Sequence, residues 1–162
     1  MPTDAKLAVH GRYLAGWNEH DPHLVVEQFA PSGTYVDANL DGPVRGDDLA
    51  EYVTDVTTAF PDLRLEQRRL IRAETDGLLV EEWTMHGTHR GPLDGLPPTG
   101  ETLALEGMSV VTIAEDGITS FRGFFDQQSF AEQLGLTFPA VLGQLPTLAV
   151  GKVRQAVKRN RQ

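Results

Sequence analysis

Four long segments of strand character follow one another from residue 63 onward, and they constrain this chain more than any other feature. Turns that contain glycine, Thr75 to Gly77 and Glu115 to Gly117, separate the first two segments and the last two. Because such short turns join neighbouring antiparallel strands, the pattern predicts a sheet built from hairpins. The four predicted strands are Leu63 to Ala73, Leu78 to His89, Leu103 to Ala114 and Ile118 to Asp126.

The segment before these strands has mostly helical character. Apolar residues recur at helical spacing from Lys6 to Asn18 and from Leu49 to Phe60, and Leu24 to Phe29 is expected to form a shorter helix. Pro31 to Gly33 is expected to form a turn that leads into a first strand, Thr34 to Asn39. Helices followed by hairpins predict an α+β fold, with helices on one face of a curved, mostly antiparallel sheet and a cavity between the layers.

The charges of the chain are unevenly distributed. All 23 acidic residues precede Lys152, and residues 1–151 contain only nine basic residues, which gives that part a formal charge of −14. Such a body repels phosphate backbones, so we expect no binding to nucleic acid. The chain has no cysteine and no apolar run that could span a membrane, and we expect a cytoplasmic protein without a membrane partner.

Several short strings together resemble the SnoaL-like polyketide cyclase family of the NTF2-like superfamily, over about Leu7 to Leu136. Limonene-epoxide hydrolases and ketosteroid isomerases are related branches. The resemblance implies a domain of residues 1–136 in which a cone-shaped fold opens towards an apolar, often polycyclic substrate and needs no cofactor. The strings are Ala59-Phe-Pro-Asp62, Thr84-Met-His-Gly-Thr-His-Arg-Gly91, Gly95-Leu-Pro-Pro-Thr-Gly100, Asp116-Gly-Ile118, Phe124-Phe-Asp126 and Gln133-Leu-Gly135.

Asp126 is the predicted catalytic base. It ends its strand beside two phenylalanines, where loss of solvent would raise the pKa of a carboxylate, and the resemblance implies an acidic base at this place. The alternative is that Asp126 caps the following helix, predicted for Gln128 to Leu134. Strand alternation places Arg122 and Phe124 on the face of Asp126, so Arg122 is a second catalytic candidate and Phe124 a substrate contact.

The strand Leu78 to His89 offers two histidines. Alternation places His86 on one side of the strand, and Trp83 and His89 on the other, unless a bulge at Gly87 changes the order. We expect His86 to serve in the pocket as an acid or an oxyanion donor, and Trp83 and His89 to contact substrate. A purely structural role is the alternative for each histidine. The epoxide hydrolases have an Arg and an Asp on this strand, and Trp83-Thr-Met85 offers neither.

Further substrate contacts are expected from the first strand and the first helix. Tyr35, Asp37 and Asn39 share one face of their strand, and Tyr13 and Trp17 lie one helical turn apart, in the cavity or in the core. No pair of histidines has good spacing for a metal, and no nucleotide-binding motif is present, so neither a metal nor a cofactor is expected.

These observations predict an enzyme that needs no cofactor and removes a proton next to a carbonyl group with Asp126, followed by aldol cyclisation or isomerisation. Its substrate would be a polyketide-type or other polycyclic molecule. An epoxide hydrolase or hydroxylation-associated enzyme of the same fold is one alternative. A non-catalytic binding protein is the other, and it is favoured if Asp126 proves to be a helix cap.

The C-terminal extension, residues 137–162, lies beyond the resemblance. Its last part, Leu148 to Arg161, has the pattern of an amphipathic basic helix. We expect it to act as a lid or to clasp a second subunit in a homodimer.

Overall fold

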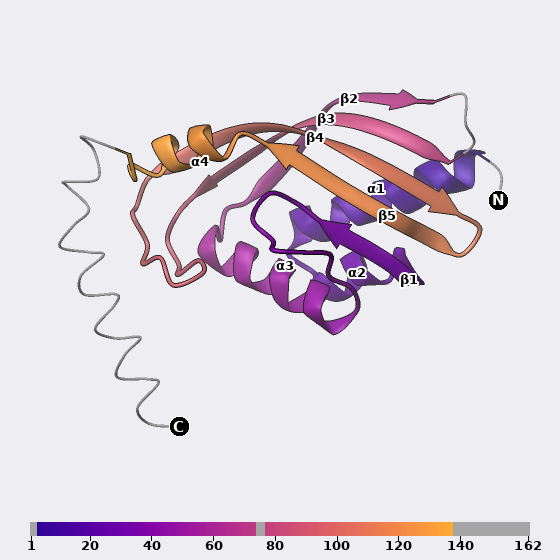
Figure 1. Ribbon diagram of the computed structural model, residues 1–162, viewed down its shortest axis with the longest axis horizontal. Coiled ribbons are helices and arrows are strands. Elements are labelled where there is room, and N and C mark those ends of the chain that lie inside the picture. The colour runs from indigo at the N-terminus through magenta and orange to yellow at the C-terminus, as the bar shows by residue number, and fades with distance from the viewer. Residues whose placement is uncertain (1–2, 74–76, 138–162) are drawn as a thin grey trace.

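The computed structural model describes residues 3–73 and 77–137, and it confirms the predicted α+β fold (Figure 1). In this part of the chain the strands form a curved five-stranded sheet with the order β1-β5-β4-β3-β2. Only β1 and β5 are parallel, and the other neighbours are antiparallel. The elements are α1 (Thr3–Glu19), α2 (Pro22–Val26), β1 (Phe29–Val36), α3 (Asp47–Ala59), β2 (Arg64–Arg72), β3 (Leu78–Thr88), β4 (Thr102–Ala114), β5 (Gly117–Phe125) and α4 (Gln127–Gln133).

The sheet has one buried and one exposed face because its strands alternate in character. In β4, Leu103, Leu105, Ser109, Val111 and Ile113 are buried, whereas the other residues of the strand are exposed or half-buried. Helices α1, α2 and α3 lie together on the concave side of the sheet, and α4 lies at the far end of β4 and β5 (Figure 1). The core therefore lies between the sheet and the first three helices.

Aromatic rings from the helices and the sheet form the centre of this core. Tyr13 of α1 packs on Phe121 of β5 with ring centroids 4.7 Å apart, and Tyr35 of β1 stacks on the same ring at 4.9 Å. Trp17 lies one turn after Tyr13 and is 4 % exposed. These contacts fix α1 across the sheet and place aromatic side chains around the space between the layers.

The first strand starts earlier than the sequence predicts. The expected turn at Pro31 to Gly33 is wrong, because these residues lie inside β1, where the pairing with β5 shifts register between Phe29 and Thr34. Proline is tolerated there because β1 is an edge strand. Gly33 is required, since a Cβ at this position would lie 2.2 Å from the carbonyl oxygen of Ile118.

The second helix also starts earlier in the chain than the sequence predicts. Pro22 is the first residue of α2, two residues before the predicted start, and the Asp21 side chain caps the helix by accepting hydrogen bonds from the backbone N–H groups of His23 and Leu24. The prediction for the extension after residue 137 lies outside the described residues. Among the described residues, no helix is long and apolar enough to cross a membrane.

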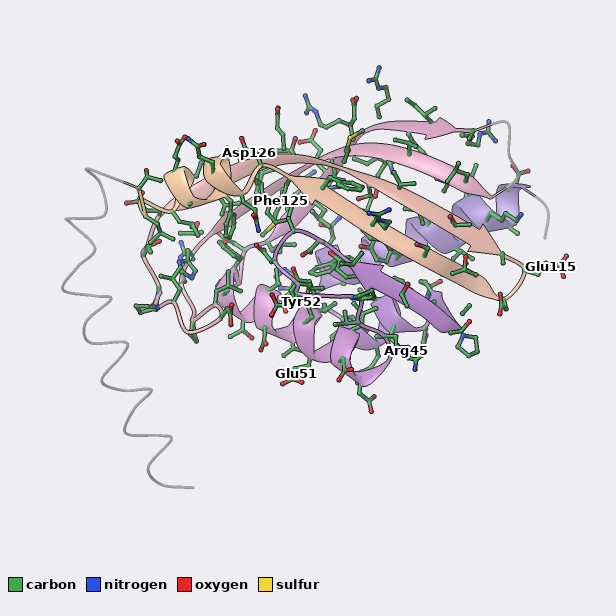
Figure 2. All side chains as sticks on the ribbon, viewed as in Figure 1. Arg45, Glu51, Tyr52, Glu115, Phe125 and Asp126 are labelled. Atoms are coloured by element: carbon green, nitrogen blue, oxygen red, sulfur yellow. The ribbon has the colours of Figure 1, made fainter. Side chains whose placement is uncertain are left out.

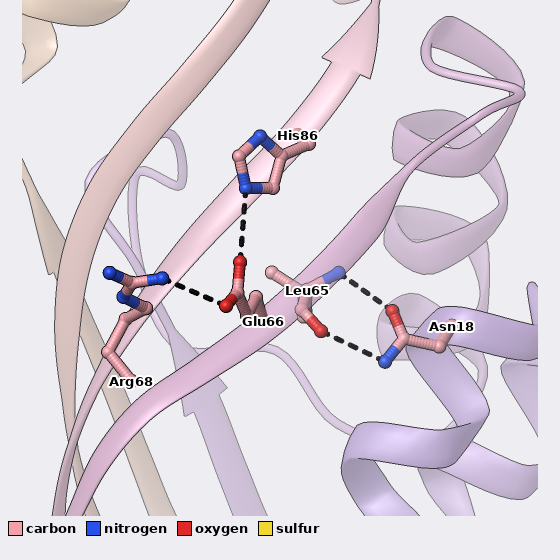
Figure 3. A network of polar contacts seen from close by, with 5 residues as sticks. All are labelled: Asn18, Leu65, Glu66, Arg68 and His86. Atoms are coloured by element: carbon pink, nitrogen blue, oxygen red, sulfur yellow. Dashed lines mark hydrogen bonds and ion pairs between the residues drawn. The ribbon is translucent and has the colours of Figure 1, made fainter.

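At the opposite edge of the sheet, the end of α1 bonds to the backbone of β2 at one residue. The Asn18 side chain donates to the backbone oxygen of Leu65 in β2 at 3.0 Å and accepts from its N–H at 2.7 Å (Figure 3). A side-chain amide thus takes the place of a further strand at this position, which fixes the end of α1 against the sheet.

Candidate functional site

A cavity of about 70 Å³ lies between the sheet and helices α1 and α3. One buried water molecule needs roughly 10–15 Å³ on this scale, so the cavity has room for several water molecules or for one end of a small ligand. Most of its wall is apolar or aromatic, with Phe60, Phe121 and Phe125 among the contributors. Against this apolar background, a few polar side chains mark where a ligand would be recognised.

The first polar group is Asp37, which directly follows β1. Its Oδ2 atom accepts a hydrogen bond from the Tyr35 hydroxyl at 2.8 Å and another from the Tyr52 hydroxyl at 2.6 Å. Its Oδ1 atom accepts from the backbone N–H of Asn39 at 2.9 Å. Burial, and then the nearby Asp37 carboxylate, raise the pKa of both tyrosines, so both phenols keep their protons.

The second polar group is Glu81 of β3, which is 2 % exposed. Its Oε2 atom accepts a hydrogen bond from Gln67 Nε2 at 3.0 Å and lies 3.2 Å from Nε2 of the buried His10, although the imidazole does not point along a good hydrogen-bond direction. Among the described residues, no hydrogen bond to Oε1 is found. Glu81 therefore offers the cavity a buried carboxylate that is held through one oxygen.

Tyr13 lies within the electrostatic influence of both carboxylates. Burial raises the pKa of its hydroxyl first, then the charge of Glu81, and Asp37 adds to the effect. The neighbouring Nε1–H of Trp17 is buried beside the Tyr13 hydroxyl without a hydrogen bond of good geometry. The Tyr13 hydroxyl is thus a poorly placed acceptor for this N–H, and a better placed acceptor that enters the cavity would compete for it.

A third polar contact fixes one wall. Trp83 Nε1 donates to the Oγ of the fully buried Ser109 at 2.8 Å, which locks the indole across β3 and β4. Gly107 is opposite Trp83 in the pairing of these strands, and a Cβ there would lie 2.3 Å from the indole. The flat indole thus needs a glycine beneath it.

The predicted position of Asp126 in the cavity is wrong. Asp126 is exposed and caps α4, because its side chain accepts hydrogen bonds from the backbone N–H groups of Gln128 and Ser129. Its neighbour Phe125 lines the cavity instead (Figure 2). The catalytic role predicted for Asp126 depended on a desolvated carboxylate inside the cavity, and the structure removes this basis.

In β5 the residues that face the cavity are each one position before the predicted ones. The inward position predicted for Arg122 and Phe124 is therefore also wrong. Phe121, Gly123 and Phe125 are the residues of β5 that line the cavity. Arg122 is exposed on the outer face, where its guanidinium lies 5.4 Å from the ring centroid of Phe124, a residue that is 43 % exposed. Neither side chain can reach a ligand between the layers.

The two histidines of β3 also lie outside the cavity. His86 lies on the outer face, 3.5 Å from Glu66, which forms an ion pair with Arg68 as well (Figure 3). His89 is fully buried behind Phe60, and its Nδ1 accepts a hydrogen bond from the backbone N–H of Thr99. The pocket position expected for His86 and the substrate contact expected for His89 are therefore wrong.

Six predicted substrate contacts do line the cavity. They are Tyr13, Trp17, Tyr35, Asp37, Asn39 and Trp83. Sequence reasoning missed Glu81, Tyr52 and Ser109. The signal for Glu81 was present, since it shares strand parity with Trp83 and Met85, which also line the cavity.

No group of three or more side chains that could together hold a metal ion is found in the described parts of the chain. The chemistry that the cavity walls themselves offer is proton transfer and hydrogen bonding. It involves the carboxylates of Asp37 and Glu81, three tyrosine hydroxyls, the Trp17 N–H and the Asn39 amide, besides the Trp83 N–H and the Ser109 hydroxyl that bond to each other.

Residues 7–134 match the model of the SnoaL-like polyketide cyclase family. No curated protein sequence matches the chain. Several solved structures share its fold. AclR of Streptomyces galilaeus, named as a hydroxylase, aligns with a TM-score of 0.71 and 20% identity over 84% of this chain and 99% of that one.

Two further structures illustrate the range of proteins with this fold. A protein of Catenulispora acidiphila with a ketosteroid isomerase-like fold, solved in complex with trimethylamine, gives a TM-score of 0.68 and 20% identity over 82% of this chain and 94% of that one. SalBIII, an epoxide hydrolase/cyclase-like enzyme of pyran ring formation in salinomycin, gives a TM-score of 0.65 and 20% identity over 78% of this chain and 94% of that one. At such identities the likeness establishes the fold alone.

Proposed function

The chain belongs to the SnoaL-like polyketide cyclase family, and we propose that it is a cofactor-independent enzyme that uses Glu81 to move a proton on a carbonyl-bearing, apolar small molecule. The observation that carries this proposal is a buried carboxylate in an apolar cavity beside two aromatic side chains with hydrogen-bond donors. A general base inside a water-excluded site is what removal of a carbon-bound proton requires.

Glu81 is a better candidate base than Asp37 because of its free acceptor capacity. Asp37 already accepts three hydrogen bonds, which occupy both of its oxygens. Glu81 is held through Oε2 by the hydrogen bond from Gln67, with His10 near the same oxygen, which leaves Oε1 to accept a proton. We assign Asp37 to ligand positioning.

The oxygen of the substrate needs a donor when the proton leaves, since negative charge then collects on it. Trp17 Nε1–H is buried without a good partner, and the raised pKa of Tyr13 keeps its hydroxyl protonated at neutral pH. These two donors lie one turn apart on α1, so one oxygen can be received by both. Removing a single donor of this kind typically costs about 10²–10³ in rate.

The proposed reaction is balanced without a further reagent. The carbon next to the carbonyl gives its proton to Glu81 Oε1, and the electron pair forms an enolate. The enolate carbon then attacks the carbon of a second carbonyl of the same molecule, which closes a ring and leaves an alkoxide oxygen that takes the proton from Glu81. Alternatively, where the enolate is conjugated with a double bond, a more distant carbon of this dienolate takes the proton from Glu81, which isomerises the substrate. In either case Glu81 ends ionised after it returns the proton.

The test compares two neighbouring glutamates. Glu81→Gln removes the base and keeps the shape, whereas Glu82→Gln makes the same change on the outer face, where Glu82 pairs with Arg69. The assay is the rate of deuterium uptake next to the carbonyl of 1-tetralone in D₂O, followed by NMR. We expect a loss of about 10²–10⁴-fold for Glu81→Gln only. Equal rates in the two variants would disprove the proposal.

Binding without turnover is the second candidate function, because the predicted base Asp126 proves to be a helix cap. The trimethylamine complex of the Catenulispora acidiphila structure is an example of a small ligand bound by a protein of this fold. If the wild-type protein binds 1-tetralone but does not accelerate the exchange above the rate in buffer, this function replaces the catalytic one for that class of ligand.

A further inference from the structure

The cavity contains more negative charge than its own side chains neutralise. Asp37 and Glu81 both line it, and no lysine, arginine or histidine is among the described residues that do so. His10 lies behind Glu81 and contacts it, but the described residues form no ion pair with Asp37. Asp37 is half-buried among mostly apolar neighbours, so solvent and not a cationic side chain meets the rest of its charge, and a cation that enters the cavity would find this carboxylate without an ionic partner.

Three aromatic rings surround this end of the cavity. Their centroids form a triangle, with 6.3 Å between Trp17 and Tyr35, 6.4 Å between Trp17 and Tyr52, and 5.7 Å between Tyr35 and Tyr52. The planes are tilted by 39° to 80° to one another, so the rings do not form a parallel stack. With these spacings, one cation can lie within the roughly 6 Å of each ring centroid over which cation–π attraction acts.

The Asp37 carboxylate is hydrogen-bonded directly to two of these three rings. The hydroxyl groups of Tyr35 and Tyr52 both donate to Asp37 Oδ2, which orients the two rings relative to the carboxylate (Figure 2 shows Tyr52 on α3). Burial and Asp37 raise the pKa of both tyrosines, so the rings stay neutral phenols with the carboxylate as the charged partner. A carboxylate beside an arrangement of aromatic rings is suited to an organic cation.

We propose that Trp17, Tyr35, Tyr52 and Asp37 form an ammonium site that binds a methylated or otherwise alkylated amine of the ligand. Both oxygens of Asp37 already accept hydrogen bonds, so little capacity remains for the several N–H groups of a primary amine or a guanidinium. An alkylated ammonium instead needs an electrostatic field and ring faces, which this site supplies.

The ammonium site does not depend on the chemistry proposed for Glu81. Trp17 would present its ring face to the cation, whereas its Nε1–H lies on the ring edge, so the two functions use different sides of one indole. The ammonium site would select substrates that carry an alkylated amine beside the reacting carbonyl. It would also bind such amines if no reaction takes place.

The test uses two probes of the same shape. Choline carries a trimethylammonium group, and 3,3-dimethylbutan-1-ol replaces it with a neutral tert-butyl group. Binding of each to the full chain is measured by titration calorimetry at low ionic strength, supported by quenching of tryptophan fluorescence. We expect choline to bind at least about tenfold more tightly, as several desolvated cation–π contacts imply. Equal binding of the two probes, or no binding of choline, would overturn the proposal.

Variants locate the ammonium site. Asp37→Asn keeps the shape of the side chain and removes its charge, and the exposed Asp41→Asn changes the net charge of the chain by the same amount. Tyr52→Leu removes one ring. We expect Asp37→Asn and Tyr52→Leu to lose the preference for choline while Asp41→Asn keeps it, with folding of each variant checked by circular dichroism.

Glu81→Gln separates this proposal from the catalytic one. It should abolish exchange on 1-tetralone and keep the preference for choline. If Glu81→Gln loses that preference and Asp37→Asn keeps it, the ammonium site has been assigned to the wrong carboxylate.

Discussion

Substitution of Asp126 distinguishes a helix cap from a catalytic base. The side chain accepts hydrogen bonds from the N–H groups of Gln128 at 2.8 Å and Ser129 at 3.3 Å, and it is exposed to solvent. Replacing a cap aspartate with alanine costs about 1 kcal/mol, whereas asparagine caps as well as aspartate. We therefore expect Asp126→Ala to lower the free energy of unfolding by about 1 kcal/mol and Asp126→Asn to leave it nearly unchanged.

Urea unfolding followed by tryptophan fluorescence measures both variants, and a loss of 1 kcal/mol corresponds to a fall in Tm of about 2–4 °C for a chain of this size. Exchange on 1-tetralone is measured in parallel. Because Asp126 lies outside the cavity, both variants should keep the wild-type rate below the unfolding transition. A stable Asp126→Asn protein without activity would show that the charge of Asp126 acts in the reaction and that the residue is more than a helix cap.

Two further predictions concern stability. Gly107→Ala should destabilise the fold by about 1–3 kcal/mol and shift the Trp83 fluorescence, because the new Cβ would overlap the indole. The control Gly11→Ala, which has no atom near the new Cβ, should stabilise α1 by about 0.5–1 kcal/mol. A Gly107→Ala protein as stable as the wild type would contradict the described packing of Trp83. Burial lowers the pKa of His89, so its stabilising effect should be complete above the pKa of the unfolded chain, near 6.5, and fall as the pH drops towards the folded value. The urea midpoint should therefore decrease more steeply below pH 6.5 in the wild type than in His89→Asn, and parallel curves would exclude this role.

The fold was readable from the sequence because its signals were redundant. Long alternating segments, glycine turns and the order of helices before hairpins all agreed, and among the described residues the structure has the predicted helices and strands within a few residues of their expected bounds. The wrong predictions of secondary structure fell on short segments whose residues suit two different local structures. Pro31 to Gly33 suits a turn, but the parallel pairing with β5 draws these residues into an edge strand. That pairing joins distant parts of the chain, and local sequence does not report it.

The candidate site was predicted only in part, because alternation gives the period of a strand and not its phase. In β5 the phase was chosen from the resemblance at Asp126, and an error of one residue moves every side chain to the other face. Arg122 was a contrary signal, since an arginine is costly inside an apolar cavity. Phe121 and Phe125 are the apolar residues of this strand that suit the cavity wall, and they do line it.

In β3 the phase could not be chosen from charge, because Glu81 and Glu82 are adjacent and either could face inward. The large neighbours on the side of Glu81 decide it, since Leu79 is buried and Trp83 lines the cavity. Tyr52 was not predictable in the same way. Its hydroxyl meets Asp37 from another element, 15 residues later in the chain, and only the packing of α3 against β1 brings them together.

The central claim is that Glu81 takes a proton from a carbon atom inside the cavity. The most direct measurement is the rate of deuterium uptake by 1-tetralone with wild type, Glu81→Gln and Glu82→Gln at equal concentrations of folded protein. We expect wild-type rates for Glu82→Gln and a loss of about 10²–10⁴-fold for Glu81→Gln. A Glu81→Gln protein that exchanges at the wild-type rate would contradict the claim.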